Sequence, residues 1–317
     1  MATIDYGFGV SAIDAEYLRP QLAAIHLIVE NGRAAIIDAG TQFSLPAVMR
    51  TLADKRIAPE QVDYLILTHI HLDHAGGAGA FMQAFPNARL TVHPRGVFHM
   101  VDPSKLIAAV SAVYGEAETY KMYGDIVPVP RGRILPTPDG ANLQLAGRTL
   151  RFYETMGHAR HHVAIHDEKT GWMFAGDTFG LSYRELDEGD RQFLFPTTSP
   201  AHFDPQAYHR SIDLVGRLAA DSVYVTHFSR VREPSLKAQV LHRLIDGHVE
   251  VALAARDAGK ERAHALHEGV RRLFLDEARR FGSTLTEDKL LEIYGMDVDL
   301  NAQGLGAWLD SETKLKA

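Results

Sequence analysis

The chain has 317 residues, 46% of which are hydrophobic, and this apolar content excludes a disordered protein and allows one large core with a smaller extension. Its formal net charge of −7 provides no overall positive field for nucleic acid or an anionic membrane surface. Because cysteine is absent, disulfides, thiolate metal sites and a cysteine nucleophile are excluded, so any metal has to be held by imidazole and carboxylate groups.

The chain opens with the pattern of an antiparallel sheet. Two apolar runs, 23–29 and 34–37, are rich in β-branched residues, and Asn31-Gly32 between them favours a tight hairpin turn. The same half is then predicted to alternate helices and strands: a helix at 46–55, a strand at 64–67, a helix at 76–85 and a strand at 90–92. The aromatic and methionine side chains of 98–123 are interpreted as core packing, with a flexible apolar lid as the alternative.

The second half is again predicted to form sheet before it turns helical. Strands are expected at 142–145, 149–153, 163–166, 172–175 and 222–225, with a helix at 205–219. From Pro234 onward the pattern is helical, with breaks expected near Gly259, Gly282-Ser283 and Gly295. We therefore expect a large main domain at 1–230 and a C-terminal helical domain at 231–317.

The strongest chemical signal follows the strand at 64–67. His69, His71, Asp73 and His74 lie within six residues, so one loop can direct four metal-binding side chains into one cavity. Neutral imidazole and carboxylate suit zinc, iron(II) or manganese. The alternative is a solvated polar loop, but four such groups are costly to crowd together without a metal. A second strand, at 222–225, likewise ends directly before a histidine, His227.

These segments resemble the metallo-β-lactamase superfamily. Residues 68–76 fit its Thr-His-x-His-x-Asp-His-x-Gly motif in every fixed position, and similar later motifs are Gly157-His158, Gly176-Asp177-Thr178 and His227. The resemblance covers about residues 20–230 and implies an α/β (α+β) protein, a four-layer αββα sandwich with a helical C-terminal extension. The pattern is most similar to glyoxalase II-like and quinolone-signal response thioesterase-like members.

The resemblance also implies a role for each motif residue. Seven side chains would hold two divalent metal ions: His69, His71 and His158 the first, Asp73, His74 and His227 the second, with Asp177 bridging. Asp38 and His162 would contact ligands rather than the ions. Asp73 would also handle the proton that is passed to the leaving group.

The sequence departs from the family pattern in two places. Ala159-Arg160-His161 replaces the common Thr-Pro-Gly, which alters the rim of the expected pocket and leaves a role for His161 open. Gly180 stands where lactonases of the family often carry a tyrosine, with Tyr183 further along. The second departure makes a standard lactonase less favoured.

The expected function is that of a metal-dependent hydrolase with a metal-bridging hydroxide, acting on a thioester or ester of a small organic molecule. Alternatives are lactonase or β-lactamase-like activity, phosphodiesterase activity, and a regulatory protein that retains the metal site. The acidic balance disfavours a nucleic-acid substrate, which would need a basic track. Zinc is the expected metal, with iron or manganese as alternatives.

Location and the role of the C-terminal helices are further expectations. No segment approaches the roughly 20 apolar residues that cross a bilayer, and the first ten residues lack a signal-peptide pattern, so a cytoplasmic protein without membrane contact is expected. A homo-oligomer is not excluded. The C-terminal helices are predicted to fold over the metal cleft and select the substrate, with a stabilising cap or a dimerisation surface as alternatives.

Overall fold

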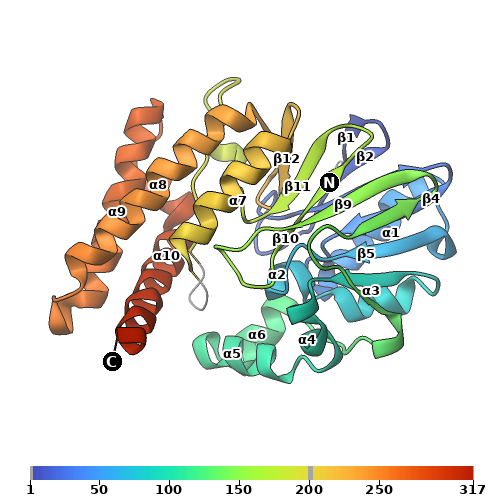
Figure 1. Ribbon diagram of the computed structural model, residues 1–317, viewed down its shortest axis with the longest axis horizontal. Coiled ribbons are helices and arrows are strands. Elements are labelled where there is room, and N and C mark those ends of the chain that lie inside the picture. Colours follow the sequence, from blue (N-terminus) through green and yellow to red (C-terminus); the bar gives the residue numbers. More distant parts are fainter. Residues whose placement is uncertain (1–2, 199–202, 317) are drawn as a thin grey trace.

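The computed structural model describes residues 3–198 and 203–316. Two β-sheets pack face to face, and helices cover both outer sides, which gives four layers (Figure 1). Helices α1 and α3 contact strands of the first sheet, and α7 contacts the second sheet. The four-layer αββα sandwich of the α/β (α+β) class that the sequence predicts is therefore confirmed.

The first sheet has seven strands in chain order, antiparallel up to the fourth and parallel from there. They are β1 (Ile4–Gly7), β2 (Val10–Asp14), β3 (Ala24–Glu30), β4 (Arg33–Ile37), β5 (Val62–Ile66), β6 (Arg89–Val92) and β7 (Ile134–Pro136). The predicted hairpin is β3–β4, and its turn residues Asn31 and Gly32 have φ values of +46° and +75°. Such positive values are what Asn-Gly supplies at low cost.

The second sheet has six strands in the order β13-β12-β11-β10-β9-β8. They are β8 (Asn142–Leu145), β9 (Arg148–Glu154), β10 (Val163–Asp167), β11 (Trp172–Gly176), β12 (Ser222–Val225) and β13 (Ser229–Arg232). Only β11 and β12 run parallel. Buried apolar side chains of both sheets, such as Ile28 and Ile37 from the first and Phe152 and Phe174 from the second, form the layer between them.

Ten α-helices lie in the described part of the chain. They are α1 (Leu45–Asp54), α2 (Leu72–Ala75), α3 (Ala78–Ala84), α4 (Val97–Val101), α5 (Ser104–Tyr114), α6 (Glu116–Tyr123), α7 (Pro205–Leu218), α8 (Pro234–Ala255), α9 (Arg262–Phe281) and α10 (Glu287–Lys316). The break expected near Gly295 is wrong, because α10 runs through it. The buried side chains of Tyr294 and Val298 pack into the core on either side of this glycine, which outweighs its low helix propensity.

The C-terminal helices share the main hydrophobic core rather than forming one of their own. Leu241, Leu244 and Val270 belong to the same buried cluster as Leu65 of β5. The rings of Phe195 and Phe274 lie 4.9 Å apart across this contact. The domain boundary at residue 230 stays a prediction. In the described chain, no helix combines the length and the apolar character that crossing a membrane would need.

Candidate metal centre

The candidate ligands follow the ends of four strands at one rim of the sandwich. His69, His71, Asp73 and His74 come from the loop after β5 and from α2, which begins at Leu72. His158 follows β9, Asp177 follows β11 directly, and His227 follows β12. The structure thus brings all seven predicted ligands to one place, from both sheets.

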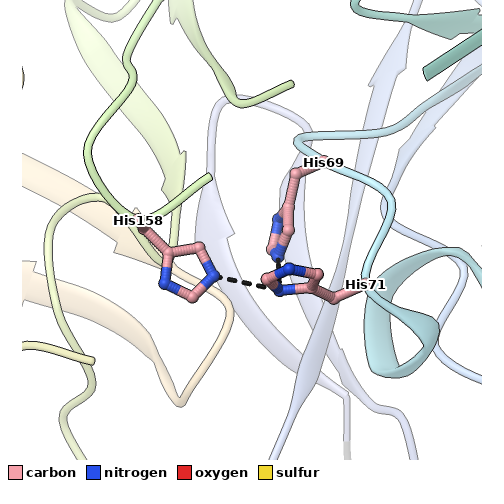
Figure 2. Close-up of side chains that lie close together, drawn as sticks. All are labelled: His69, His71 and His158. Carbon is pink, nitrogen blue, oxygen red and sulfur yellow. Dashed lines mark hydrogen bonds between the residues drawn. The ribbon is translucent and has the colours of Figure 1, made fainter. Parts of the chain in front are cut away.

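The seven side chains form three overlapping groups of possible ligands. These groups are His69 with His71 and His158, His69 with His74 and Asp177, and Asp73 with His74 and His227, and within each group the donor atoms lie within 4.8 Å of one another. Figure 2 shows the first group, in which the three rings point toward each other from two loops. His71 Nδ1 lies 2.9 Å from His69 Nε2 and 3.0 Å from His158 Nε2.

Asp177 lies between these groups. Its Oδ2 is 3.4 Å from His74 Nε2 and 3.6 Å from His158 Nε2, and its Oδ1 is 3.7 Å from His227 Nε2. On the far side, Asp73 Oδ2 lies 3.3 Å from His227 Nε2. One carboxylate therefore faces the imidazoles of both predicted metal positions, as a bridging ligand has to.

The donor set fits divalent metal ions. Although His74 Nε2 and Asp177 Oδ1 are buried, neither has a hydrogen-bond partner among the described residues. Buried polar atoms are almost always bonded, so such a pair needs an explanation, and bound cations would satisfy both. Nitrogen and carboxylate oxygen are also the ligands that zinc, iron(II) and manganese accept.

The electrostatics of the site favour neutral histidines in the first group and an ionised Asp177, which are the forms that bind metal. Burial and the neighbouring histidines lower the pKa of His69 and His71 well below the ordinary value, so these rings are neutral and their lone pairs available. Burial disfavours the charged form of Asp177, but His74 and His227 outweigh it and hold the pKa of this carboxyl well below its usual range. Conversely, Asp177 and Asp73 raise the pKa of His74 against the effect of burial. The carboxylates thus carry the negative charge that cations would neutralise.

Asp38 ties the ligand loops together without being part of any ligand group. Its carboxylate accepts hydrogen bonds from the Thr68 amide at 2.8 Å and from the Thr226 hydroxyl at 3.0 Å, and it lies 2.9 Å from His74 Nδ1. It therefore joins the loop after β5 to the end of β12 and orients one ligand ring. This is the contact that the sequence predicts for it.

His162 likewise supports a ligand rather than belonging to a group. Its Nε2 accepts a hydrogen bond from the Asp177 amide at 3.2 Å, and its Nδ1 lies 2.9 Å from the Thr155 hydroxyl. The packing leaves room only for glycine before Asp177, because a Cβ on Gly176 would lie 2.6 Å from His162 Nε2 and φ there is +49°. Two further ligands are oriented by backbone carbonyls, His158 by Thr197 and His227 by Leu22.

A cavity of about 520 Å³ opens onto the metal centre. Residues of α5 and α6, from the segment interpreted as packing or lid, form part of its lining, and so do Met296, Asp297 and Leu300 of α10. Sequence reasoning expected the C-terminal helices near the cleft but named none of these three residues. No local signal marks them, because a helical pattern shows which face is apolar but not which distant segment it meets. His161 also lines the cavity.

Tyr183, the tyrosine beyond the lactonase position, is buried and its hydroxyl lies 3.1 Å from both carboxylate oxygens of Asp297. Burial raises the pKa of Asp297 to about 7. The hydroxyl is thus engaged with α10, and this tyrosine fixes the helix against the cavity wall. A different pair of hydroxyls, those of Tyr17 and Tyr123, meets at 3.1 Å in the cavity lining.

Comparisons with known proteins fit this geometry. The profile of the metallo-beta-lactamase superfamily matches residues 18–227. A metallo-beta-lactamase fold-containing protein of Sulfurisphaera tokodaii is 23% identical over 260 residues, which span 80% of this chain and 92% of that protein. A metallo-beta-lactamase family protein of Thermus thermophilus has a similar structure, with a TM-score of 0.65, 23% identity and coverage of 96% of this chain and 94% of that one.

One group of similar proteins carries a named activity. A hydroxyacylglutathione hydrolase of Stenotrophomonas maltophilia is 29% identical over 164 residues, which span 51% of this chain and 48% of that enzyme. The match to this enzyme therefore leaves about half of its length unaligned. The structure of a subclass B3 metallo-beta-lactamase from a soil metagenome library is similar at a TM-score of 0.54 and 15% identity, with 79% of this chain and 97% of that one covered. At this identity the likeness shows the fold alone.

Proposed function

Because the chain belongs to the metallo-beta-lactamase superfamily, whose members include hydrolases, we propose that it hydrolyses a thioester or ester of a small organic molecule, with two divalent metal ions as cofactors. The observation that carries the proposal is the convergence of seven buried or half-buried ligand side chains beside a cavity of about 520 Å³. Zinc is the metal we expect first, and iron or manganese would accept the same donors.

The candidate ligands divide into two sets that share Asp177. His69, His71 and His158 would hold one ion, and Asp73, His74 and His227 the other. When bound, such ions supply an acidified water with a pKa of about 7 and an electrophile for the substrate carbonyl. The chain itself supplies no cysteine nucleophile, so water is the expected attacking group.

Asp73 is the residue we assign to proton handling. Its side chain is 24% exposed, against 7% for that of Asp177, and it lines the cavity. His74 and His227 outweigh the effect of burial and lower its pKa, so the carboxylate is ionised and able to accept a proton. From this position it can pass that proton to the leaving group.

The comparisons and the net charge support this substrate class. Similarity to hydroxyacylglutathione hydrolases favours a thioester. A phosphodiester of nucleic acid would call for a basic track, and the net charge of −7 works against one. Lactone and β-lactam hydrolysis are the runners-up. The Tyr183 hydroxyl is occupied by Asp297, which agrees with the departure from the lactonase pattern at Gly180.

Two measurements test the proposal. Elemental analysis of protein purified without chelators should find about two transition-metal ions per chain, and one or none in metal-replete protein would contradict the two-ion site. The same protein should then be assayed against a thioester, an ester, a lactone and bis-p-nitrophenyl phosphate. Faster cleavage of the thioester or ester supports the proposal, whereas cleavage of the phosphodiester alone would overturn it.

The remaining sequence-based predictions belong to the same proposal. A small molecule is the expected partner, without nucleic acid or membrane, in the cytoplasm. Three residues of α10 in the cavity lining support a role of the helices beyond residue 230 in substrate selection.

A further inference from the structure

The cavity beside the metal centre has mainly apolar walls. Leu106 and Val110 of α5 and Met122 of α6 line it, as do Met296 and Leu300 of α10. In Figure 1, α5 and α6 lie at the lower edge of the molecule, and α10 lies to their left, beside α8 and α9. The walls therefore come from two parts of the chain that are far apart in sequence, and candidate metal ligands line the same cavity.

These wall residues keep apolar surface uncovered. Met296 is 41% exposed and Tyr114, also in the lining, is 38% exposed, while Leu106, Val110 and Leu300 are half-buried. Apolar surface that gathers in a concave site usually marks what the site binds, because a matching ligand removes it from water. A volume of about 520 Å³ is in the range of small-molecule sites.

Away from the metal centre, the cavity lining offers few cations to an anionic substrate. Outside the metal centre and its histidines, the charged groups in the described lining are Lys105 and Asp297, and no arginine is among them. The Lys105 ammonium lies 5.6 Å from the centre of the Phe98 ring, and it is the one lysine in the described lining. A substrate with several carboxylates, such as a glutathione thioester, would lose their hydration here without gaining matching cations.

From these observations we propose that the substrate carries an uncharged, apolar acyl chain, which lies between α5 and α10 while its carbonyl meets the metal centre. This inference rests on the proposed ester or thioester hydrolysis and names its acyl group. The apolar walls bind the part of the substrate that does not react. Each methylene that the walls bury strengthens binding by roughly threefold to fourfold.

The first test is a chain-length series on the metal-loaded protein. We expect kcat/KM for p-nitrophenyl acetate, butyrate, hexanoate and octanoate to rise by roughly threefold per methylene. A hydroxyacyl glutathione thioester should be cleaved at least about tenfold less efficiently than the octanoyl thioester of a small neutral thiol. A flat or falling series, or a preference for the glutathione thioester, would overturn the inference.

The second test uses matched variants of the two walls. Val110→Asp and Leu300→Asp place a charge in the apolar lining and should lower the ratio of octanoate to acetate hydrolysis at least about tenfold. Ala112→Asp on α5 and Gln303→Asp on α10 make the same change at exposed positions outside the lining and should keep the wild-type ratio. If Val110→Asp does not fold, the near-isosteric Val110→Thr should still lower the ratio, and an unchanged ratio would count against the inference.

A binding measurement separates this inference from the proposed function. Octanamide, which resists hydrolysis, should displace the dye Nile red from both the metal-free and the metal-loaded protein, and more weakly from the two wall variants. If octanamide binds in this way but no ester or thioester is hydrolysed, the proposed function is wrong and the apolar binding site is supported. If esters are hydrolysed at equal rates along the series and octanamide does not bind, the proposed function is supported and the apolar acyl site is wrong.

Discussion

The two ends of the β-sandwich both bury charged side chains, but only one end pairs these charges fully within the chain. At the metal end, His74 Nε2 and Asp177 Oδ1 are buried without a hydrogen-bond partner among the described residues. At the other end, Arg148 at the start of β9 and Asp167 at the end of β10 form a fully buried ion pair. Arg148 also donates to the carbonyl of Phe8 at 2.6 Å and lies 3.3 Å from Glu30, which joins the two sheets.

The difference teaches that buried charge alone does not identify a functional site. The Arg148 cluster satisfies its own polar groups, so it needs no ligand and its role is structural. At the metal end, clustered histidines disfavour one another's charged forms and two buried polar atoms lack partners, an arrangement that bound cations would satisfy. Since β9 carries Arg148 at one end and leads toward His158 at the other, one strand connects both kinds of cluster.

The largest effect is expected for Asp177→Ala, at the metal end. Removing the carboxylate that faces both ligand sets should release at least one metal ion and lower kcat/KM by roughly 10³-fold or more. Elemental analysis and ester hydrolysis measure both. Asp213→Ala, an exposed carboxylate on α7, serves as the control and should change neither quantity. Unchanged metal content in the Asp177 variant would remove the bridging assignment.

The next effect is expected at the opposite end, for Arg148→Met. The substitution leaves the Asp167 carboxylate buried without its cation, which should lower the free energy of unfolding by about 3 to 5 kcal/mol. Urea unfolding measures the loss. The folded variant should still bind metal, because Arg148 lies at the end of β9 that is opposite to His158. In the control Arg33→Met, the pair with Asp63 is 38% and 25% exposed, so a loss of at most about 1 kcal/mol is expected. Equal losses in the two variants would break the comparison.

A smaller effect is expected for the supports of the metal end. Asp38→Asn and His162→Gln should each weaken metal affinity or lower the rate by roughly 10- to 100-fold, because they disturb ligand orientation without removing a ligand. Competition with a chelator measures the affinity. Complete loss of metal from the His162 variant would instead make this residue a ligand. Wild-type affinity and rate would show that both residues only stabilise the fold.

The smallest effect concerns a buried histidine that belongs to neither end. His248 on α8 packs on the Phe274 ring, and burial lowers its pKa to about 4. Because the unfolded chain binds this proton with a pKa near 6.5, the contribution to stability is complete above that value and is lost as the pH falls toward 4. Between pH 7 and pH 5 the loss amounts to about 2 kcal/mol.

Replacing His248 with leucine should remove this part of the pH dependence. Urea unfolding at pH 7 and pH 5, with a chelator present in both proteins, compares the variant with the wild type. The stability difference between the two proteins should shift in favour of the variant at pH 5. Parallel pH dependence would show that this histidine titrates normally and that its burial does not disfavour the charge.

The candidate site was predictable from the sequence to a greater extent than its surroundings. His69 to His74 sit in one tight motif, and His227 follows a strand whose apolar run is plain, so local patterns sufficed to find these residues. Strands β1, β2, β7 and β13 were not predicted. Strands β1, β7 and β13 have at most four residues and some partly exposed side chains, and Ser11 and Asp14 interrupt the apolar run of β2. Met296 and Leu300 meet the cavity through packing between distant segments, and periodicity within α10 carries no information about that meeting.

The order of the ligands along the chain bears on when the metal centre can form during synthesis. The loop after β5 offers four candidate ligands early, whereas Asp177 and His227 arrive only with β11 and β12 of the second sheet. Asp38 then closes the arrangement by bonding both Thr68 and Thr226. His69, His71 and His158 are all made before β11, whereas the set of Asp73, His74 and His227 stays incomplete until the residues after β12 are made. A product that ends before His227 therefore keeps the first candidate set and lacks part of the second, and we expect it to be inactive.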